Sequence, residues 1–153
     1  MVVFKLLLTI HIFSAILGLG PGFVMIYIVT KAKTMTELKH AYVIRNRIHI
    51  FVMVGGTLLL LTGLGMGGLR PYLFQEIWYI LSLILFLIAL AAGPVLLSPR
   101  SKPIKEMLDS YPKEAGEVIP KEYYELANKL FFYERITNVI FMVIIALMIL
   151  KPF

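Results

Sequence analysis

The chain has 153 residues, of which 59% are apolar and only 16% are charged, and its mean hydropathy is +0.86. Soluble domains carry about 25% charged residues, so this composition excludes an ordinary soluble protein and is typical of an integral membrane protein. The net charge of +6 fits membrane topology and attraction to anionic lipid headgroups, and we predict no nucleic-acid partner. The absence of cysteine excludes disulfides and thiolate metal sites.

Four apolar stretches are long enough to cross a bilayer, which takes about 20 residues. They cover approximately residues 4–30, 48–69, 77–97 and 130–150. Little sequence lies outside them, so we predict one all-α integral membrane domain over residues 1–153, folded as an antiparallel bundle of four transmembrane helices. The first stretch is about twice as long as the apolar region of a signal peptide and is followed directly by lysines, which favours a retained anchor.

The distribution of basic residues predicts the orientation of the bundle. Twelve of the 15 Lys and Arg residues lie in or beside the first and third connections, and only Lys5, Arg70 and Lys151 lie on the other side. By the positive-inside rule, both termini should lie outside a cytoplasmic membrane and both long connections inside it. Pro120 suits the first turn of a helix that runs to about Leu150, so we expect the fourth helix to extend into the cytoplasm.

The spans also show stripes of small and polar residues, which membrane helices turn toward their neighbours. In the first span this stripe holds His11, Ser14, Ala15, Gly18 and Gly22, and in the second it holds Arg45, His49, Gly56, Gly63 and Gly67. In the third span the residues that repeat at alternating spacings of four and three are Gln75, Tyr79, Ser82, Phe86, Ala89 and Gly93. Further expectations are a connection over Lys31–Ala41, an interfacial aromatic belt that includes Trp78 and Tyr79, and an end of the third helix at Pro94 and Pro99.

His11 is the first candidate functional residue, because an ionisable side chain inside a span is costly and is often functional. By helical rise it lies roughly 10 Å below the outer surface, level with Thr62 and with two side chains of the third span. One interpretation is an interhelical hydrogen bond worth about 1 kcal/mol. The others are proton transfer and ligation of haem b or a transition metal, with His11 as the metal ligand. The candidate cofactor-binding residues are His11, Tyr79, Ser82 and Met66.

A second polar group is predicted near the inner surface, formed by Arg45, His49, Glu134 and Asn138. It is either a charge-balanced structural cluster or an entry point for protons or anions in which Glu134 holds His49. The two span histidines should not share one haem, because on antiparallel helices they differ in depth by nearly 20 Å.

Three segments carry a family resemblance: Leu6–Gly22, Arg45–Gly63, and Ile77-Trp78 at the start of the third span. They resemble a family of small four-helix prokaryotic membrane proteins of unknown function. The chain is more distantly similar to the membrane domain of copper-resistance D proteins and to HemJ-type protoporphyrinogen oxidases. The latter resemblance implies that His11 is associated with haem; the third-span lysine that also acts in those enzymes has no counterpart within residues 77–97.

Two functions from different classes follow. The first is binding of haem or a metal ion in the outer half of the bundle through His11. The second is a small oligomeric permease or an accessory membrane subunit with a structural histidine. In the second case the glycine-rich helix faces would join copies of the chain into a homo-oligomer within the lipid bilayer.

Overall fold

The computed structural model describes residues 1–153, and its regular structure is entirely helical. The elements in chain order are α1 (Val2–Thr30), α2 (Met35–Leu69), η1 (Pro71–Gln75), α3 (Ile77–Ala92), η2 (Gly93–Leu97), α4 (Ser98–Ser110), η3 (Lys113–Ala115) and α5 (Lys121–Leu150). Four helical stretches are long and apolar enough to cross a membrane: Val2–Thr30, Met35–Leu69, Ile77–Ser110 and Lys121–Leu150. The predicted all-α fold with four spanning helices is therefore confirmed.

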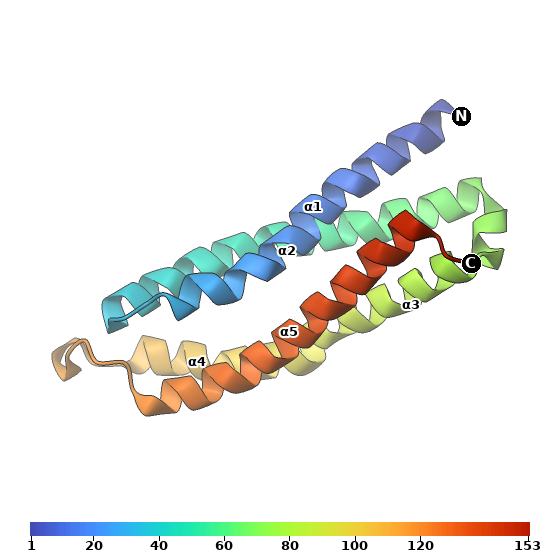
Figure 1. The fold of residues 1–153 in the computed structure, drawn as a ribbon. Helices are drawn as coiled ribbons and strands as arrows, with labels where there is room; N and C mark the ends of the chain where they lie inside the picture. The colour runs from blue at the N-terminus through green and yellow to red at the C-terminus, as the bar shows by residue number, and fades with distance from the viewer.

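The helices form two pairs. α1 packs along α2, and α3 packs with α5, whereas contacts between the pairs are much fewer. Both chain termini and the α2–α3 connection lie at one end of the molecule, which we call the terminal end (Figure 1). The α1–α2 turn and the α4–α5 connection lie at the other end, which we call the basic end because most of the Lys and Arg residues flank it.

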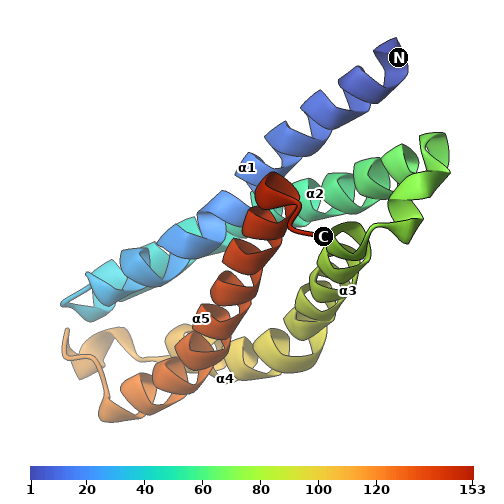
Figure 2. The same ribbon diagram turned by 45° about the vertical axis from the view of Figure 1, so that its right-hand side comes forward.

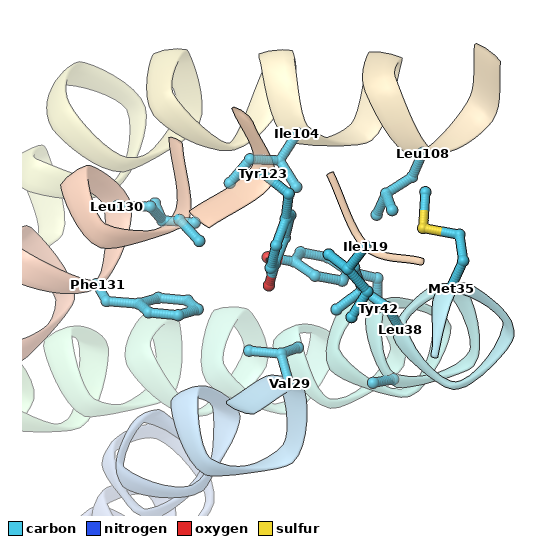
Figure 3. Packing of buried hydrophobic residues seen from close by; sticks show 12 residues of the cluster. Val29, Met35, Leu38, Tyr42, Ile104, Leu108, Ile119, Tyr123, Leu130 and Phe131 are labelled. Atoms are coloured by element: carbon cyan, nitrogen blue, oxygen red, sulfur yellow. The ribbon is translucent and has the colours of Figure 1, made fainter. Parts of the chain in front are cut away.

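The largest apolar core lies at the basic end (Figure 3). It is a cluster of 12 buried residues from α1, α2, α4, α5 and the connection before α5, and its fully buried members include Leu38, Ile104 and Leu130. Two smaller clusters of four buried residues each lie further toward the terminal end. The largest share of the packing between the two helix pairs thus lies at the basic end, and the two smaller clusters join the pairs further along the bundle.

Helix α2 begins earlier than predicted, at Met35, so the expected connection over Lys31–Ala41 is wrong. The Thr34 hydroxyl accepts a hydrogen bond from the backbone N–H of Glu37 at 3.2 Å, and the Glu37 carboxylate accepts one from the N–H of Thr34 at 3.4 Å. This reciprocal capping box satisfies amide groups that the first turn of a helix leaves unpaired. The turn between α1 and α2 is consequently reduced to residues 31–34.

The third helix does not end at its prolines. A π-helical segment, η2, carries it from α3 into α4, so that helical structure continues to Ser110. Proline lacks the N–H that an α-helical turn requires, and a wider turn accommodates this loss by changing the direction of the axis. Figure 2 shows the bend between α3 and α4. The expected break at Pro94 and Pro99 is thus a change of direction, and α4 turns to pack against the beginning of α5.

The predicted continuous helix from Pro120 to about Leu150 is confirmed, with Pro120 as the cap of α5. The connection before it is tied to α2 by Glu117. Its carboxylate accepts hydrogen bonds from the backbone N–H of Thr36 at 3.0 Å and from the Thr36 hydroxyl at 2.7 Å. These bonds lower the pKa of Glu117, the backbone bond contributing most. A residue 81 positions later in the chain therefore helps to cap α2.

The third-span stripe is confirmed in its middle, where Tyr79, Ser82, Phe86 and Ala89 are buried, but not at its ends, since Gln75 is exposed and Gly93 is only half-buried. The interfacial aromatic belt is only partly correct. Tyr72 is exposed, but Trp78 and Tyr79 are buried against Met66 in the core at the terminal end. Their rings meet edge-on at a centroid distance of 5.9 Å.

Candidate functional site

The first candidate site is a cavity of about 490 Å³ between α1 and α5, near the terminal end of the bundle, with α2 and α3 behind it. We call it the His11 cavity. Its lining is almost wholly apolar and includes Ala15, Leu19 and Gly20 of α1 and Ile144 and Met148 of α5. His11, Tyr79 and Ser82 are its polar side chains. The cavity exists because α1 and α5 belong to different pairs and make few contacts.

His11 is held by a hydrogen bond across the first helix pair. Its Nδ1 lies 2.8 Å from the Thr62 Oγ1. The Thr62 hydroxyl donates its own hydrogen to the Leu58 carbonyl at 2.6 Å, so it can only accept from His11. The proton of a neutral imidazole is therefore assigned to Nδ1, and Nε2 keeps a free lone pair. His11 thus combines a fixed ring with an available acceptor nitrogen.

The other predicted members of this site are less available. The Tyr79 hydroxyl donates to the Gly63 carbonyl at 2.9 Å, and the Ser82 hydroxyl donates to the Trp78 carbonyl at 2.7 Å. Both donors are therefore used inside the protein, as expected for hydroxyls in a membrane span. Met66 is buried in the core at the terminal end and does not line the cavity. Among the four predicted residues, only His11 lines the cavity and keeps a polar atom, Nε2, that makes no hydrogen bond.

The metal and haem hypotheses find no support in this geometry. No group of three or more His, Asp or Glu side chains could hold a metal ion. A haem would also bring two carboxylates, and the lining of the His11 cavity contains no Lys or Arg to pair with them. The residues present fit neither a bound metal ion nor haem b.

The second candidate site lies between the helix pairs toward the basic end. It is a cavity of about 510 Å³, lined by all four spanning helices, which we call the Arg45 cavity. On one wall the guanidinium of Arg45 and the carboxylate of Glu134 form a buried, two-point ion pair between α2 and α5. The Nη1–Oε2 distance of this pair is 3.2 Å. This is the one ion pair of the structure, and each side chain is about 10% exposed or less.

The predicted inner polar group contains a charge-balanced pair, but not the pair of Glu134 with His49 that one of the two interpretations expected. Glu134 binds Arg45, and no hydrogen bond joins it to His49, which is exposed at the edge of the same cavity. The Asn138 amide instead donates to the Gly22 carbonyl of α1 at 3.1 Å. All four predicted residues, Arg45, His49, Glu134 and Asn138, line the Arg45 cavity, but the hydrogen bonds divide them.

Sequence reasoning missed Lys105 and Ser98 on α4, which also line this cavity. Their signal was hidden because the prolines suggested that the third helix ends before them. Once that helix is continued through η2, Lys105 lines the cavity together with His49 and Asn46 of α2. The basic residues of α4 are thus part of the bundle, not of a separate surface segment.

Comparison with known families gives a match to the model of a family described as predicted integral membrane protein (DUF2269), over residues 5–152. No curated protein and no solved structure matches the chain. The more distant similarity to copper-resistance D proteins and HemJ-type oxidases is therefore without support from these comparisons.

Proposed function

Because the chain belongs to the DUF2269 family of predicted integral membrane proteins, we propose a function that takes place within the bilayer: binding of an uncharged, mainly apolar molecule in the His11 cavity. The observation that carries this proposal is the acceptor nitrogen left free on His11, a residue that lines an almost wholly apolar space. The occupant would donate one hydrogen bond, from a hydroxyl or N–H group, to Nε2.

The lining restricts the charge of the occupant. A charged group transferred into an apolar cavity loses its hydration, and no side chain of opposite charge lines the cavity to compensate it. An uncharged amphiphile such as an isoprenoid alcohol satisfies both requirements, because its chain contacts the apolar wall while its hydroxyl pairs with His11. Such molecules dissolve in the bilayer and can reach the cavity between α1 and α5.

The orientation and location remain proposals that rest on the basic residues. We propose that the basic end faces the cytoplasm, that both termini lie outside a cytoplasmic membrane, and that α5 extends from the bilayer into the cytoplasm. The His11 cavity would then lie in the outer half of the bundle.

The alternative function, an oligomeric permease or accessory subunit, has less support in the structure. Its argument rested on glycine faces free to join copies of the chain. Gly18 and Gly55, however, already meet within one chain, between α1 and α2. This part of the glycine-rich surface is thus used inside the protomer.

Binding of farnesol tests the proposal. The protein is placed in phosphatidylcholine nanodiscs, and the affinities for farnesol and for farnesyl methyl ether, which lacks the donor hydrogen, are measured relative to protein-free nanodiscs. We expect farnesol to bind about tenfold more tightly than the ether, the difference that one well-formed hydrogen bond produces. Substitution His11→Phe, which keeps the ring but removes the acceptor, should make the two affinities equal.

Two further variants locate the binding. The exposed His40 of α2 lies outside the cavity, so His40→Phe should leave the preference unchanged. Gly20 lines the cavity, and a side chain added there would meet nothing within 4 Å, so Gly20→Leu should narrow the cavity and reduce the binding of both compounds. Equal affinities in the wild type, or a preference that persists in His11→Phe, would refute the proposal.

A further inference from the structure

The Arg45 cavity differs in chemistry from the His11 cavity. Its end nearest α4 is polar, with Asn46, His49, Ser98 and Lys105 on the lining. Its opposite part is apolar and is lined by Val52 and Met53 of α2 and by Phe86 and Leu90 of α3. A single cavity therefore joins a polar compartment at the basic end to an apolar compartment within the bundle.

The charges of the polar compartment do not balance. Arg45 and Glu134 neutralise each other through their ion pair. Lys105 has no carboxylate within ion-pair distance and makes no hydrogen bond. Because the Glu134 carboxylate is already bound by Arg45 at two points, the compartment keeps one uncompensated positive charge, beside the donor amide of Asn46 and the imidazole of His49.

The apolar compartment is accessible from the side. α2 and α3 are joined at the terminal end but make few contacts along their lengths, because α2 packs on α1 and α3 packs on α5. Met53 of α2 and Leu90 of α3 both line the cavity and are exposed at its side. A hydrocarbon chain could therefore enter between α2 and α3 without leaving the apolar part of the bilayer.

We propose that the Arg45 cavity binds an anionic lipid. Its phosphate group lies beside Lys105, and one acyl chain lies between α2 and α3. Free phosphate would satisfy the lysine but would leave the apolar compartment unfilled, whereas a zwitterionic lipid would fill that compartment but place its own cation near Lys105. The basic end is also the place where positive side chains meet headgroups.

Competition between two lipids tests this proposal. The purified protein is equilibrated with equal amounts of phosphatidylglycerol and phosphatidylcholine that have the same acyl chains, and the retained lipid is measured by native mass spectrometry. We expect one retained phosphatidylglycerol and at least about a tenfold preference for it, as one charge-assisted hydrogen bond gives. Lys105→Gln should remove the preference, and Lys105→Arg should keep it.

Matched variants exclude a general effect of surface charge. Lys102 is exposed on the same helix but does not line the cavity, so Lys102→Gln should keep the preference. A side chain added at Gly56, which lines the cavity, would meet nothing within 4 Å, so Gly56→Leu should reduce the retention of both lipids. The proposal is overturned if Lys105→Gln keeps the preference or Lys102→Gln loses it equally. It is also overturned if millimolar inorganic phosphate displaces the lipid, because the site would then bind a free anion.

Discussion

The buried ion pair between Arg45 and Glu134 joins the two helix pairs at the level of individual residues. Each ion loses hydration on burial, and the pair offsets this cost only while both partners are present. Arg45 lies on α2 and Glu134 on α5, so the pair fixes one helix of the first pair against one helix of the second. Together with the Asn138–Gly22 hydrogen bond, it is one of the few polar links between them.

Removing one member of this ion pair should cost far more stability than removing both. Arg45→Met or Glu134→Leu leaves an uncompensated buried charge, and we expect each to lower the free energy of unfolding by about 3–5 kcal/mol. The double variant Arg45→Met/Glu134→Leu should recover most of this loss, because it replaces the pair by apolar contacts. Denaturant unfolding in detergent micelles measures all three.

The exposed His49 provides a control for this comparison of single and double variants. No hydrogen bond connects it to Glu134, so the effects of His49→Ala and Glu134→Leu should add. Additive effects of Arg45→Met and Glu134→Leu would instead contradict a coupled pair.

The sequence supplied the members of this polar group but not its pairing. Arg45 and His49 are one helical turn apart on the same face, so either could be placed against Glu134 by spacing alone. The choice depends on side-chain reach and on the angle between α2 and α5, which no local pattern encodes. For His11, helical rise predicted that Thr62 lies at the same depth in the bundle, and Thr62 is its hydrogen-bond partner.

Among the helices, the first pair owes its close packing to two glycines. A Cβ added at Gly18 would lie 2.8 Å from the backbone of Gly55, and one added at Gly55 would overlap the backbone of Gly18. Direct backbone contact of this kind lets two membrane helices approach along their length. The expected stripe correctly included Gly18, but it named Gly56 in place of its neighbour Gly55.

Adjacent glycines in α2 allow a matched test of this contact. Gly55→Ala should lower the free energy of unfolding by about 1–3 kcal/mol, because the new methyl group meets backbone that cannot move aside. Gly56→Ala should be neutral or stabilising by up to about 1 kcal/mol, since alanine favours helix and its Cβ meets nothing within 4 Å. Thermal unfolding in detergent distinguishes them, and equal stability of the two variants would contradict the contact.

The lengths of the helices show where sequence reasoning succeeds and where it does not. The four apolar runs were sufficient to predict four spans, because apolar length is set by the bilayer. The start of α2 was missed although Thr34 and Glu37 have the spacing of a capping box. At Pro94 proline indicated a disturbed helix, but whether the chain stops or bends depends on α5, against which α4 packs.

At the scale of the whole molecule, the charge asymmetry and the fold agree on which segments lie together. The α1–α2 turn and the α4–α5 connection occupy the same end, and this end carries most of the basic residues. The sequence could predict this grouping because alternate connections of an antiparallel bundle must lie on the same side. It could not predict the division into two pairs, which follows from details of packing such as the Gly18–Gly55 contact.

Cysteine labelling tests the proposed orientation. The chain contains no cysteine, so Ser110→Cys at the basic end and Tyr72→Cys at the terminal end each provide one exposed thiol. With the basic end in the cytoplasm, an impermeant maleimide added to intact cells should label Tyr72→Cys and leave Ser110→Cys unlabelled until the cells are opened. The reverse pattern would show that the termini are inside.

The interactions of the first helix pair also determine the order in which the helices can assemble during synthesis. The Gly18–Gly55 contact, the His11–Thr62 hydrogen bond and the capping box of α2 are all contained within residues 2–69. Glu117, Glu134 and Asn138, by contrast, are synthesised only after this hairpin has emerged from the ribosome. The first two helices can therefore assemble as a unit during translation, while the second pair assembles on a partner that is already formed.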